Sequence, residues 1–507
     1  MYLMGIDVGT TGVKGVLISQ RGETVAESIN YYPVHSPRTN WFEQNPDDWW
    51  KAAVLSIQKM LKSSGIKPSQ VAGIGLSGQY HGLVIVNRNL KVLRPCIMWN
   101  DQRTAKQGTY IVEKIGTKTL MEIAATRGAP YFTACKLLWV RENEPGVYEK
   151  IYKMMLPKDY IRLKLTGEFV TDVTDASGTL FLDVHKRRWS PELLEKLEVD
   201  REILPAVVES PDVTGLVTKK AAEETGLKPG IPVAGGGGDQ AAAAIGNGIV
   251  EEGLISYSIG TSGVVYAATE RVLVDEYGRI DSFCHAVPGT WCLLACINSA
   301  AGSLRWFEER FLDFEKLKAK ERGVSIYKII EEKALEVPPG SDRLIFLPYL
   351  VGERHPHTDP NAKGVFFGLH SGHTKQHALR AVLEGVAYSF RDCLEVTKEL
   401  GIVPKEIRAT GGGAKSKLWI NIQVNTSGHP IVETTTDEGG AAYGAAILGG
   451  VCCGIFKTVK EACSSLVKTK GAVEPDPELM KLYDRYYRFY RNLYPLFKNS
   501  YQELAKL

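Results

Sequence analysis

The chain has 507 residues, 44% of them hydrophobic and 23% charged, with a formal net charge of +3. This length suffices for two or more domains, and the composition is that of an ordinary globular protein. The small net charge gives no support to a nucleic-acid or membrane partner, no apolar run is long enough to span a bilayer, and no charged-then-apolar leader precedes the first predicted strand. Nine scattered cysteines without a Cys-x-x-Cys pair favour free thiols in a reducing compartment over disulfides or a zinc site. We therefore expect a cytoplasmic protein that acts on small molecules.

Two similar segments, about half a chain apart, predict a pair of phosphate-binding turns. Residues 2–14 and 254–265 each show an apolar strand, a turn of glycine and hydroxyl residues, and a second apolar strand. Such a turn aims backbone N–H groups and hydroxyls at one point, and glycine lets a phosphate approach the backbone. Only the first copy carries an acid, Asp7, and a base, Lys14, so we expect metal handling on the first half. We assign to nucleotide binding Lys14 and the turn residues Gly9, Thr10, Thr11, Gly260, Thr261 and Ser262.

The N-terminal half alternates predicted strands and helices. A helix begins at 45–48, where a cap residue, a proline and two acids follow one another. Buried strands follow at 71–78 and 231–234, and an alanine-rich helix starts at 241–244. The second turn motif begins right after 246–253, so we place the domain boundary there. This gives a first lobe, 1–247, and a second lobe, 248–507.

The second half repeats the alternation. Strands are predicted at 344–350, 406–410 and 430–436, and helices at 376–400 and 476–507. Alternating strands and helices indicate an α/β fold, and the repeated turn motif indicates two lobes around a cleft, where ligands bind. We also expect that the last helix packs back on the first lobe.

A glycine run that ends in an acid is the most specific site signal. Gly235 to Gly238 follow a buried strand, and Asp239 and Gln240 open the next helix. Four glycines leave no side chains above the strand end, so a ligand can approach the backbone. In phosphoryl transfer to an alcohol, a carboxylate placed there accepts the hydroxyl proton. The alternative is that Asp239 only caps its helix; beside two phosphate-type turns, the catalytic role is favoured.

Two further loops offer polar groups that suit a polyol. One follows strand 71–78, and strand ends are where α/β sheets bind ligands. The other combines an aromatic plane with an amide and an acid, a mixture that suits sugars. The alternatives are a buried core histidine in the first loop and a surface loop around a buried Trp in the second. The candidate sugar contacts are Gln79, Tyr80 and His81 in the first loop and Trp99, Asn100 and Asp101 in the second.

Glycine junctions in the second half suit nucleotide contact. Gly411, Gly412 and Gly413 follow a strand and open a helix, as backbone contact with a nucleoside or its phosphates requires, although a tight structural turn is the alternative. Residues 437–440 form a similar junction, which fits a nucleotide edge or close helix–sheet packing equally well. A Gly-Lys-Ser/Thr phosphate loop and a Gly-x-Gly-x-x-Gly fingerprint are both missing, which disfavours a Rossmann dehydrogenase.

Taken together, the motifs resemble the FGGY carbohydrate kinases. The resemblance rests on the paired turns, the Gly-Asp-Gln at 238–240, and longer tracts that extend from the first strand to about Gly450. Within the family it is closest to the pentulose kinases. The tracts that carry it are 77–82, 97–101, 131–139, 156–160, 175–179, 346–354, 364–369 and 383–385.

The resemblance implies an actin-like, ribonuclease-H-like fold with two lobes and a central cleft. ATP would lie mostly on the second lobe and the sugar mostly on the first. Asp239 would be the catalytic base, and His81 and Gln240 would contact the sugar. Gly9, Thr10, Gly260 and Thr261 would contact phosphates, Asp7 would meet Mg²⁺ through water, and Gly411, Gly412 and Gly413 would lie along the adenosine.

The expected reaction is phosphorylation of D-xylulose by ATP and Mg²⁺ to the 5-phosphate. Tyr80 stands where the family commonly has methionine and Gln240 where asparagine is common, so the acceptor stays open among D-xylulose, ribulose, L-xylulose and polyols. An actin-like or chaperone-like ATPase that drives partner binding is an alternative of another class, and a non-catalytic sugar sensor is a third. Family members are often dimers, so we also expect a homodimer.

Overall fold

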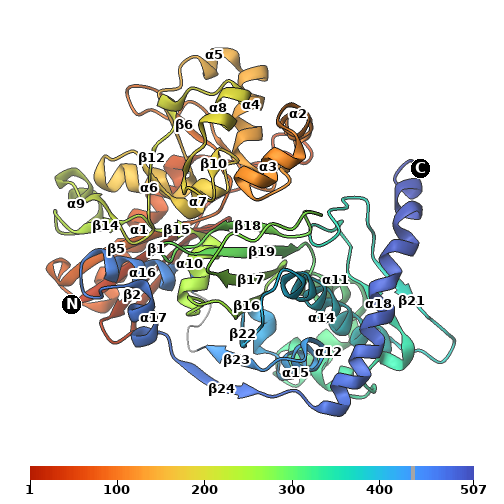
Figure 1. Ribbon diagram of the computed structural model, residues 1–507. Helices are drawn as coiled ribbons and strands as arrows, with labels where there is room; N and C mark the ends of the chain where they lie inside the picture. Colours follow the sequence, from red (N-terminus) through yellow and green to blue (C-terminus); the bar gives the residue numbers. More distant parts are fainter. Residues whose placement is uncertain (435–439) are drawn as a thin grey trace.

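The computed structural model describes residues 1–434 and 440–507. Two sheets of seven strands each form the centres of two α/β lobes, with a smaller subdomain beside them (Figure 1). This confirms the predicted fold class. The junction at 437–440 lies mostly outside the described residues. Within the described ranges, none of the helices is long and apolar enough to cross a membrane.

The first-lobe sheet has the strand order β13-β14-β5-β1-β2-β3, with β15 also paired to β5. β1 runs antiparallel to β2 and parallel to β5, which places Lys14 and Ser77 on either side of Asp7. α1 (Pro46–Ser64) begins as predicted, because the Asn45 side chain accepts a hydrogen bond from Asp47 N at 3.1 Å. The strands are β1 (Tyr2–Val8), β2 (Gly12–Ser19), β3 (Thr24–Tyr31), β5 (Val71–Gly78), β13 (Val213–Leu216), β14 (Pro232–Ala234) and β15 (Gly237–Gly238).

The second-lobe sheet repeats this local pattern. β16 is antiparallel to β17 and parallel to β22, as β1 is to β2 and β5. The repeated sequence motif is therefore a repeated structural unit. The order is β18-β19-β17-β16-β22-β23-β24. The strands are β16 (Leu254–Ile259), β17 (Gly263–Thr269), β18 (Asp281–Cys284), β19 (Trp291–Ile297), β22 (Glu406–Thr410), β23 (Ile431–Thr434) and β24 (Thr469–Val473).

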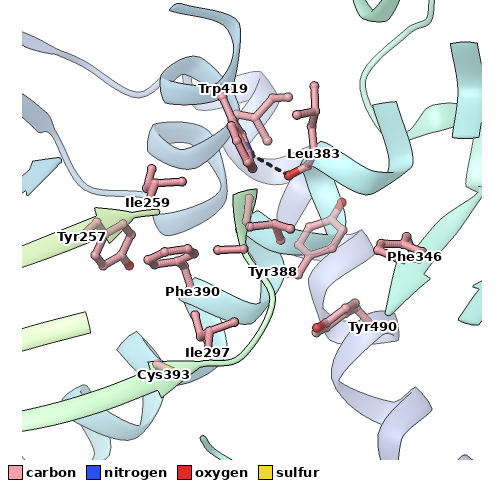
Figure 2. Close-up of a cluster of buried hydrophobic side chains, with 14 of the residues drawn as sticks. Tyr257, Ile259, Ile297, Phe346, Leu383, Tyr388, Phe390, Cys393, Trp419 and Tyr490 are labelled. Carbon is pink, nitrogen blue, oxygen red and sulfur yellow. Dashed lines mark hydrogen bonds between the residues drawn. The ribbon is translucent and has the colours of Figure 1, made fainter. Parts of the chain in front are cut away.

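The second lobe has one dominant core (Figure 2). α14 (Lys375–Glu399) crosses it, and Trp419 of α15 (Lys417–Ser427) donates from Nε1 to the Leu383 carbonyl of α14 at 3.0 Å. Pairwise packing of rings such as Tyr257 and Phe390, 4.9 Å apart, fixes α14 against the sheet. The other helices of this lobe are α11 (Ala301–Phe311), α12 (Asp313–Glu321) and α13 (Ile326–Leu335).

The segment that returns to the first lobe is not the last helix. α16 (Gly440–Cys452) and α17 (Val459–Leu466) share a core with β1 and β2. α16 also lies so close to β5 that a Cβ at Gly75 would sit 1.7 Å from the Ala445 carbonyl oxygen. α18 (Pro477–Leu504) instead runs along the second lobe (Figure 1), and its Tyr483 and Tyr490 are buried in the core of that lobe. Our expectation for the last helix was therefore wrong, and the boundary at 247/248 stays a prediction.

The subdomain joins the two lobes. Its Phe132 and Leu137 share one core with Tyr266 and Phe283 of the second sheet. Its helices are α2 (Ala105–Ile115), α3 (Thr117–Ala124), α4 (Thr133–Asn143), α5 (Pro145–Tyr148), α7 (Val173–Ser177) and α8 (Pro191–Leu197). By contrast, α6 (Pro157–Thr166) and α9 (Lys219–Thr225) share a core with α1 and the first-lobe sheet. Short strand pairs complete the chain: β4 (Glu43–Gln44) with β7 (Cys96–Ile97), β6 (Val84–Val86) with β8 (Lys153–Met155), β9 (Val170–Asp172) with β12 (Ala206–Val208), β10 (Leu182–Asp183) with β11 (Arg188–Trp189), and β20 (Ile345–Leu347) with β21 (Val365–Phe367).

Candidate active site

The first turn, between β1 and β2, is held by side chains from two other segments. Gln44 Nε2 donates to the Thr10 carbonyl at 2.7 Å, and Trp99 Nε1 donates to Thr10 Oγ1 at 3.1 Å. Gly9 N donates to the Gly12 carbonyl at 3.1 Å, which closes the turn, and Thr11 is exposed at its tip. The half-exposed Trp99 of the predicted sugar loop therefore lies directly beside the predicted phosphate turn.

Asp7 lies at the end of β1 beneath this turn. Ser77 Oγ donates to Asp7 Oδ1 at 2.8 Å. Burial raises the pKa of Asp7 to about 6, although the Ser77 hydrogen bond and the charge of Lys14 oppose the rise. Because a carboxylate with a raised pKa gains from a nearby cation, Asp7 suits a place beside a hydrated Mg²⁺, which prefers oxygen ligands and retains its waters.

The second turn is tied to the start of α11. Gly260 N donates to the Ser262 carbonyl at 3.1 Å, and the Thr261 carbonyl accepts from Ala300 N and Gly302 N at 3.0 and 2.9 Å. Thr261 and Ser262 are exposed. The hydroxyls at the tip are therefore accessible to a ligand while the backbone is held fixed.

A cavity of 830 Å³ opens beside the second turn. Gly260 and Thr261 line one side and Gly412 and Gly413 another. A Cβ at Gly412 would meet nothing within 4 Å, whereas one at Gly413 would lie 2.3 Å from Ile259 Cγ2, so only Gly412 leaves open backbone. No local sequence pattern marks the apolar wall of this cavity, which includes Leu304, Ile330, Leu383 and Trp419. Its size and apolar lining suit a purine nucleoside, with the phosphates at the turn.

Asp239 is the first residue of α10 (Asp239–Gly246), not its cap. The N-cap is Gly238, which has no side chain to bond. Burial, followed by repulsion from Asp7, raises the pKa of Asp239 to about 7, while hydrogen bonds from Gln240 oppose the rise. Asp239 and Gln240 are half-buried, so the carboxylate is accessible and poised near neutral pH.

The glycines before Asp239 serve packing. Gly236 has φ +70°, and a Cβ there would lie 2.1 Å from the Leu76 carbonyl oxygen. A Cβ at Gly238 would lie 2.2 Å from Tyr80 Cζ. The expectation that this run exposes open backbone to a ligand was wrong for both positions, because the β5 backbone and the Tyr80 ring occupy that space.

His81 is held in one tautomer. Nδ1 lies 2.7 Å from the Gly178 carbonyl, so it carries the proton and donates. Burial, together with the charges of Arg354 and Lys136, lowers the pKa of His81 to about 3. The ring is therefore neutral, and its Nε2 is a hydrogen-bond acceptor of the kind that a sugar hydroxyl requires.

The remaining predicted sugar contacts divide into two groups. Gln79 Oε1 and Asn100 Oδ1 are buried acceptors without a hydrogen-bond partner among the described residues, so both suit a ligand hydroxyl. Tyr80 is buried against Gly238, and Asp101 is only 2% exposed. Both Asp101 oxygens are bound by Arg103, through Nε at 2.9 Å and an Nη at 2.7 Å, so Asp101 stabilises its loop.

The sequence and the fold match known proteins over nearly the whole chain. Residues 2–246 and 255–453 match the N-terminal and C-terminal domain models of the FGGY family of carbohydrate kinases. The xylulose kinase of Escherichia coli is 38% identical over 98% of this chain and all of the relative, and the gluconokinase of Bacillus subtilis is 30% identical over 99% of this chain and 98% of the relative. A crystal structure of a xyloylose kinase from Brucella ovis, 36% identical, superposes with a TM-score of 0.90 over 98% of this chain and 100% of that one. The chain therefore belongs to the FGGY family of carbohydrate kinases, which transfer a phosphoryl group from ATP to a sugar.

Proposed function

We propose that this sugar kinase phosphorylates D-xylulose at O5, with Asp239 as the general base. Relatives named xylulose kinase that match nearly the whole chain support the substrate, but the 30% identical gluconokinase shows that a sugar acid is the competing acceptor. The observation that carries the choice is a pair of uncharged acceptors on the loop after β5, the strand that pairs with β15 directly before Asp239. Gln79 and His81 offer uncharged acceptors there, and a neutral ketose matches them better than a carboxylate does.

The nearest cations are already engaged. Arg354 and Lys136 are the positive charges that act on His81. Arg354 pairs with Asp281 at 3.4 Å, and Lys136 donates to the Tyr131 carbonyl at 2.5 Å. A gluconate carboxylate would have to compete with these partners, at a cost that a neutral ketopentose avoids.

The reaction needs the sugar hydroxyl to be held, deprotonated and aligned with the γ-phosphoryl group. Asp239, whose pKa of about 7 suits a base at neutral pH, accepts the proton from the C5 hydroxyl. His81 Nε2 and Gln79 Oε1 accept hydrogen bonds from other hydroxyls and thereby orient the sugar. The two turns donate backbone N–H groups to the phosphates.

Mg²⁺ is part of the proposal. Asp7 is a carboxylate at the cleft whose pKa burial raises, and its oxygens fit this cation through bound water. When bound, the ion neutralises charge on the phosphates. A homodimer and a cytoplasmic location remain predictions.

The test is the rate of ADP release with D-xylulose, L-xylulose, D-ribulose, D-gluconate and glycerol at fixed ATP and Mg²⁺. We expect kcat/KM to be highest for D-xylulose and a sugar-free rate close to zero. A higher kcat/KM for gluconate would overturn the assignment of D-xylulose as the substrate but would leave the sugar kinase activity in place. ADP release that no sugar increases would favour the ATPase alternative. Gln79→Ala should raise KM for the sugar and leave KM for ATP unchanged.

A further inference from the structure

The short helix α7 lies beneath both loops that form the sugar site. At its first turn, Thr174 Oγ1 accepts a hydrogen bond at 2.9 Å from Gly238 N, the amide directly before Asp239. At its end, the Gly178 carbonyl accepts from His81 Nδ1 at 2.7 Å. One five-residue helix therefore contacts the backbone that carries the base and the ring that faces the sugar.

A buried carboxylate fixes the Thr174 hydroxyl. Thr174 donates from Oγ1 to Asp172 Oδ2 at 2.5 Å, and its backbone N donates to the same oxygen at 2.7 Å. Because its proton is committed to Asp172, the hydroxyl presents a lone pair to Gly238 N. Ser210 Oγ also donates to Asp172 Oδ2, at 3.2 Å, which leaves Oδ2 little freedom to move.

The opposite oxygen of Asp172 faces a buried lysine. Lys158 Nζ lies 2.8 Å from Asp172 Oδ1, 2.7 Å from Asp159 and 2.9 Å from Asp175, and its side chain is fully buried. Burial alone would lower the pKa of Lys158, but the three carboxylates outweigh burial and raise it above its usual value. Arg162 pairs with Asp159 at 3.5 Å.

The same cluster reaches the other end of the glycine run. An Nη of Arg162 donates to the Gly235 carbonyl at 2.5 Å. The run from Gly235 to Gly238 is thus held at both ends by groups that depend on buried charges. Buried charge pairs of this kind contribute little net stability. We therefore infer that this cluster serves to fix the geometry of the glycine run.

We propose that Thr174, anchored by Asp172 and Lys158, is a positioning residue that sets the place of Asp239 relative to His81. The inference rests on Asp239 as the base. Removing the hydroxyl leaves Gly238 N without its acceptor and frees the run to shift, and a shift of about 1 Å can lower a rate about 10²-fold. Nucleotide contacts come from other segments and should not change.

The test compares Thr174→Val, which keeps the shape and loses the hydroxyl, with Thr174→Ser, which keeps the hydroxyl. We expect Thr174→Val to lower kcat about 10- to 100-fold with KM for ATP and sugar within threefold, and Thr174→Ser to restore most of the rate. The matched control is Thr171→Val. Thr171 is equally buried, on the strand that leads into α7, and its hydroxyl has no hydrogen-bond partner among the described residues.

Three results would overturn the inference: an unchanged kcat in folded Thr174→Val, a loss carried by KM alone, or an equal loss in Thr171→Val. If Thr174→Val does not fold, Asp172→Asn tests the inference by the same criteria, because it weakens the hydrogen bond that holds the Thr174 hydroxyl. Asp239→Asn separates the two proposals. If it is inactive while Thr174→Val is normal, only the positioning role fails; if it is active, the general base fails as well.

Discussion

Replacing Asp239 with asparagine should remove the base and leave both substrates bound. The asparagine side chain has the same size, so the neighbouring Gly238 and Tyr80 packing should persist. α10 keeps its own cap, Gly238, and the substitution loses the interaction of a first-turn charge with the helix dipole, about 0.3–1 kcal/mol. The neutral side chain also removes the burial penalty and the repulsion from Asp7 that raise the pKa of Asp239, so the fold should not lose stability.

The magnitude follows from the chemistry of the site. A positioned general base typically increases the rate about 10²- to 10⁴-fold, so its removal should lower kcat by at least about 10²-fold. The charge of Asp239 also repels that of Asp7, and its removal should leave ATP binding equal or tighter. The expected signature is therefore a collapse of kcat without a rise in the dissociation constants.

The assay pairs calorimetric titration of sugar and ATP with sugar-dependent ADP release. Asp48→Asn is the matched control, because Asp48 is also a first-turn carboxylate in the first lobe, on α1, where it pairs with Lys51 at 3.1 Å. It should keep wild-type kcat. Turnover near wild type in a folded Asp239→Asn protein would show that Asp239 is not the general base.

Three further outcomes follow from the same structure. Since Asp239 must be ionised to act, kcat/KM for the sugar should fall as pH drops below about 7, and rate measurements from pH 5 to 9 would contradict this if the profile were flat. The proposed ATP contacts come from the turns of both lobes, so small-angle scattering should show a smaller radius of gyration with sugar and a non-hydrolysable ATP analogue; an unchanged radius at saturation would count against closure. Burial alone would lower the pKa of His355, but its hydrogen bonds with Asp281 and Cys296 and the charge of Asp281 outweigh burial and raise the pKa from 6.5 to about 9, so protonated His355 should contribute about 3 kcal/mol below pH 6.5 that is lost as pH rises through 9. Denaturant unfolding below pH 6.5 and above pH 9 should show this loss in the free energy of unfolding of the wild type and not in that of Asp281→Asn.

Local signals predicted the elements that build the site. Asn45 before Pro46 marks the start of α1, and the apolar run 71–78 coincides with β5, because caps and strand periods depend on neighbours in sequence. The repeated turn motif predicted two related sheets for the same reason. Asp239 could be singled out as a candidate base because an acid that follows a run of glycines is a local sequence pattern.

The rest depends on contacts between distant segments. The glycine run suggested open backbone, but whether a glycine faces a ligand or a neighbour is decided by Leu76 and Tyr80, which lie far away in the sequence. Asp101 was predicted to contact the sugar, but it is held by the amide of Phe42, which is distant in sequence, as well as by its near neighbour Arg103. The cavity beside the second turn and the return of α16 to the first lobe likewise arise only from packing.

The proposed reaction transfers the γ-phosphoryl group of ATP to O5 of a ketopentose. It can be followed by ³¹P and ¹³C NMR of the products formed from ATP, Mg²⁺ and D-xylulose labelled with ¹³C at C5. We expect ADP together with a phosphate monoester whose phosphorus couples to the labelled carbon. ADP accompanied only by inorganic phosphate, or an ester at another carbon, would contradict it.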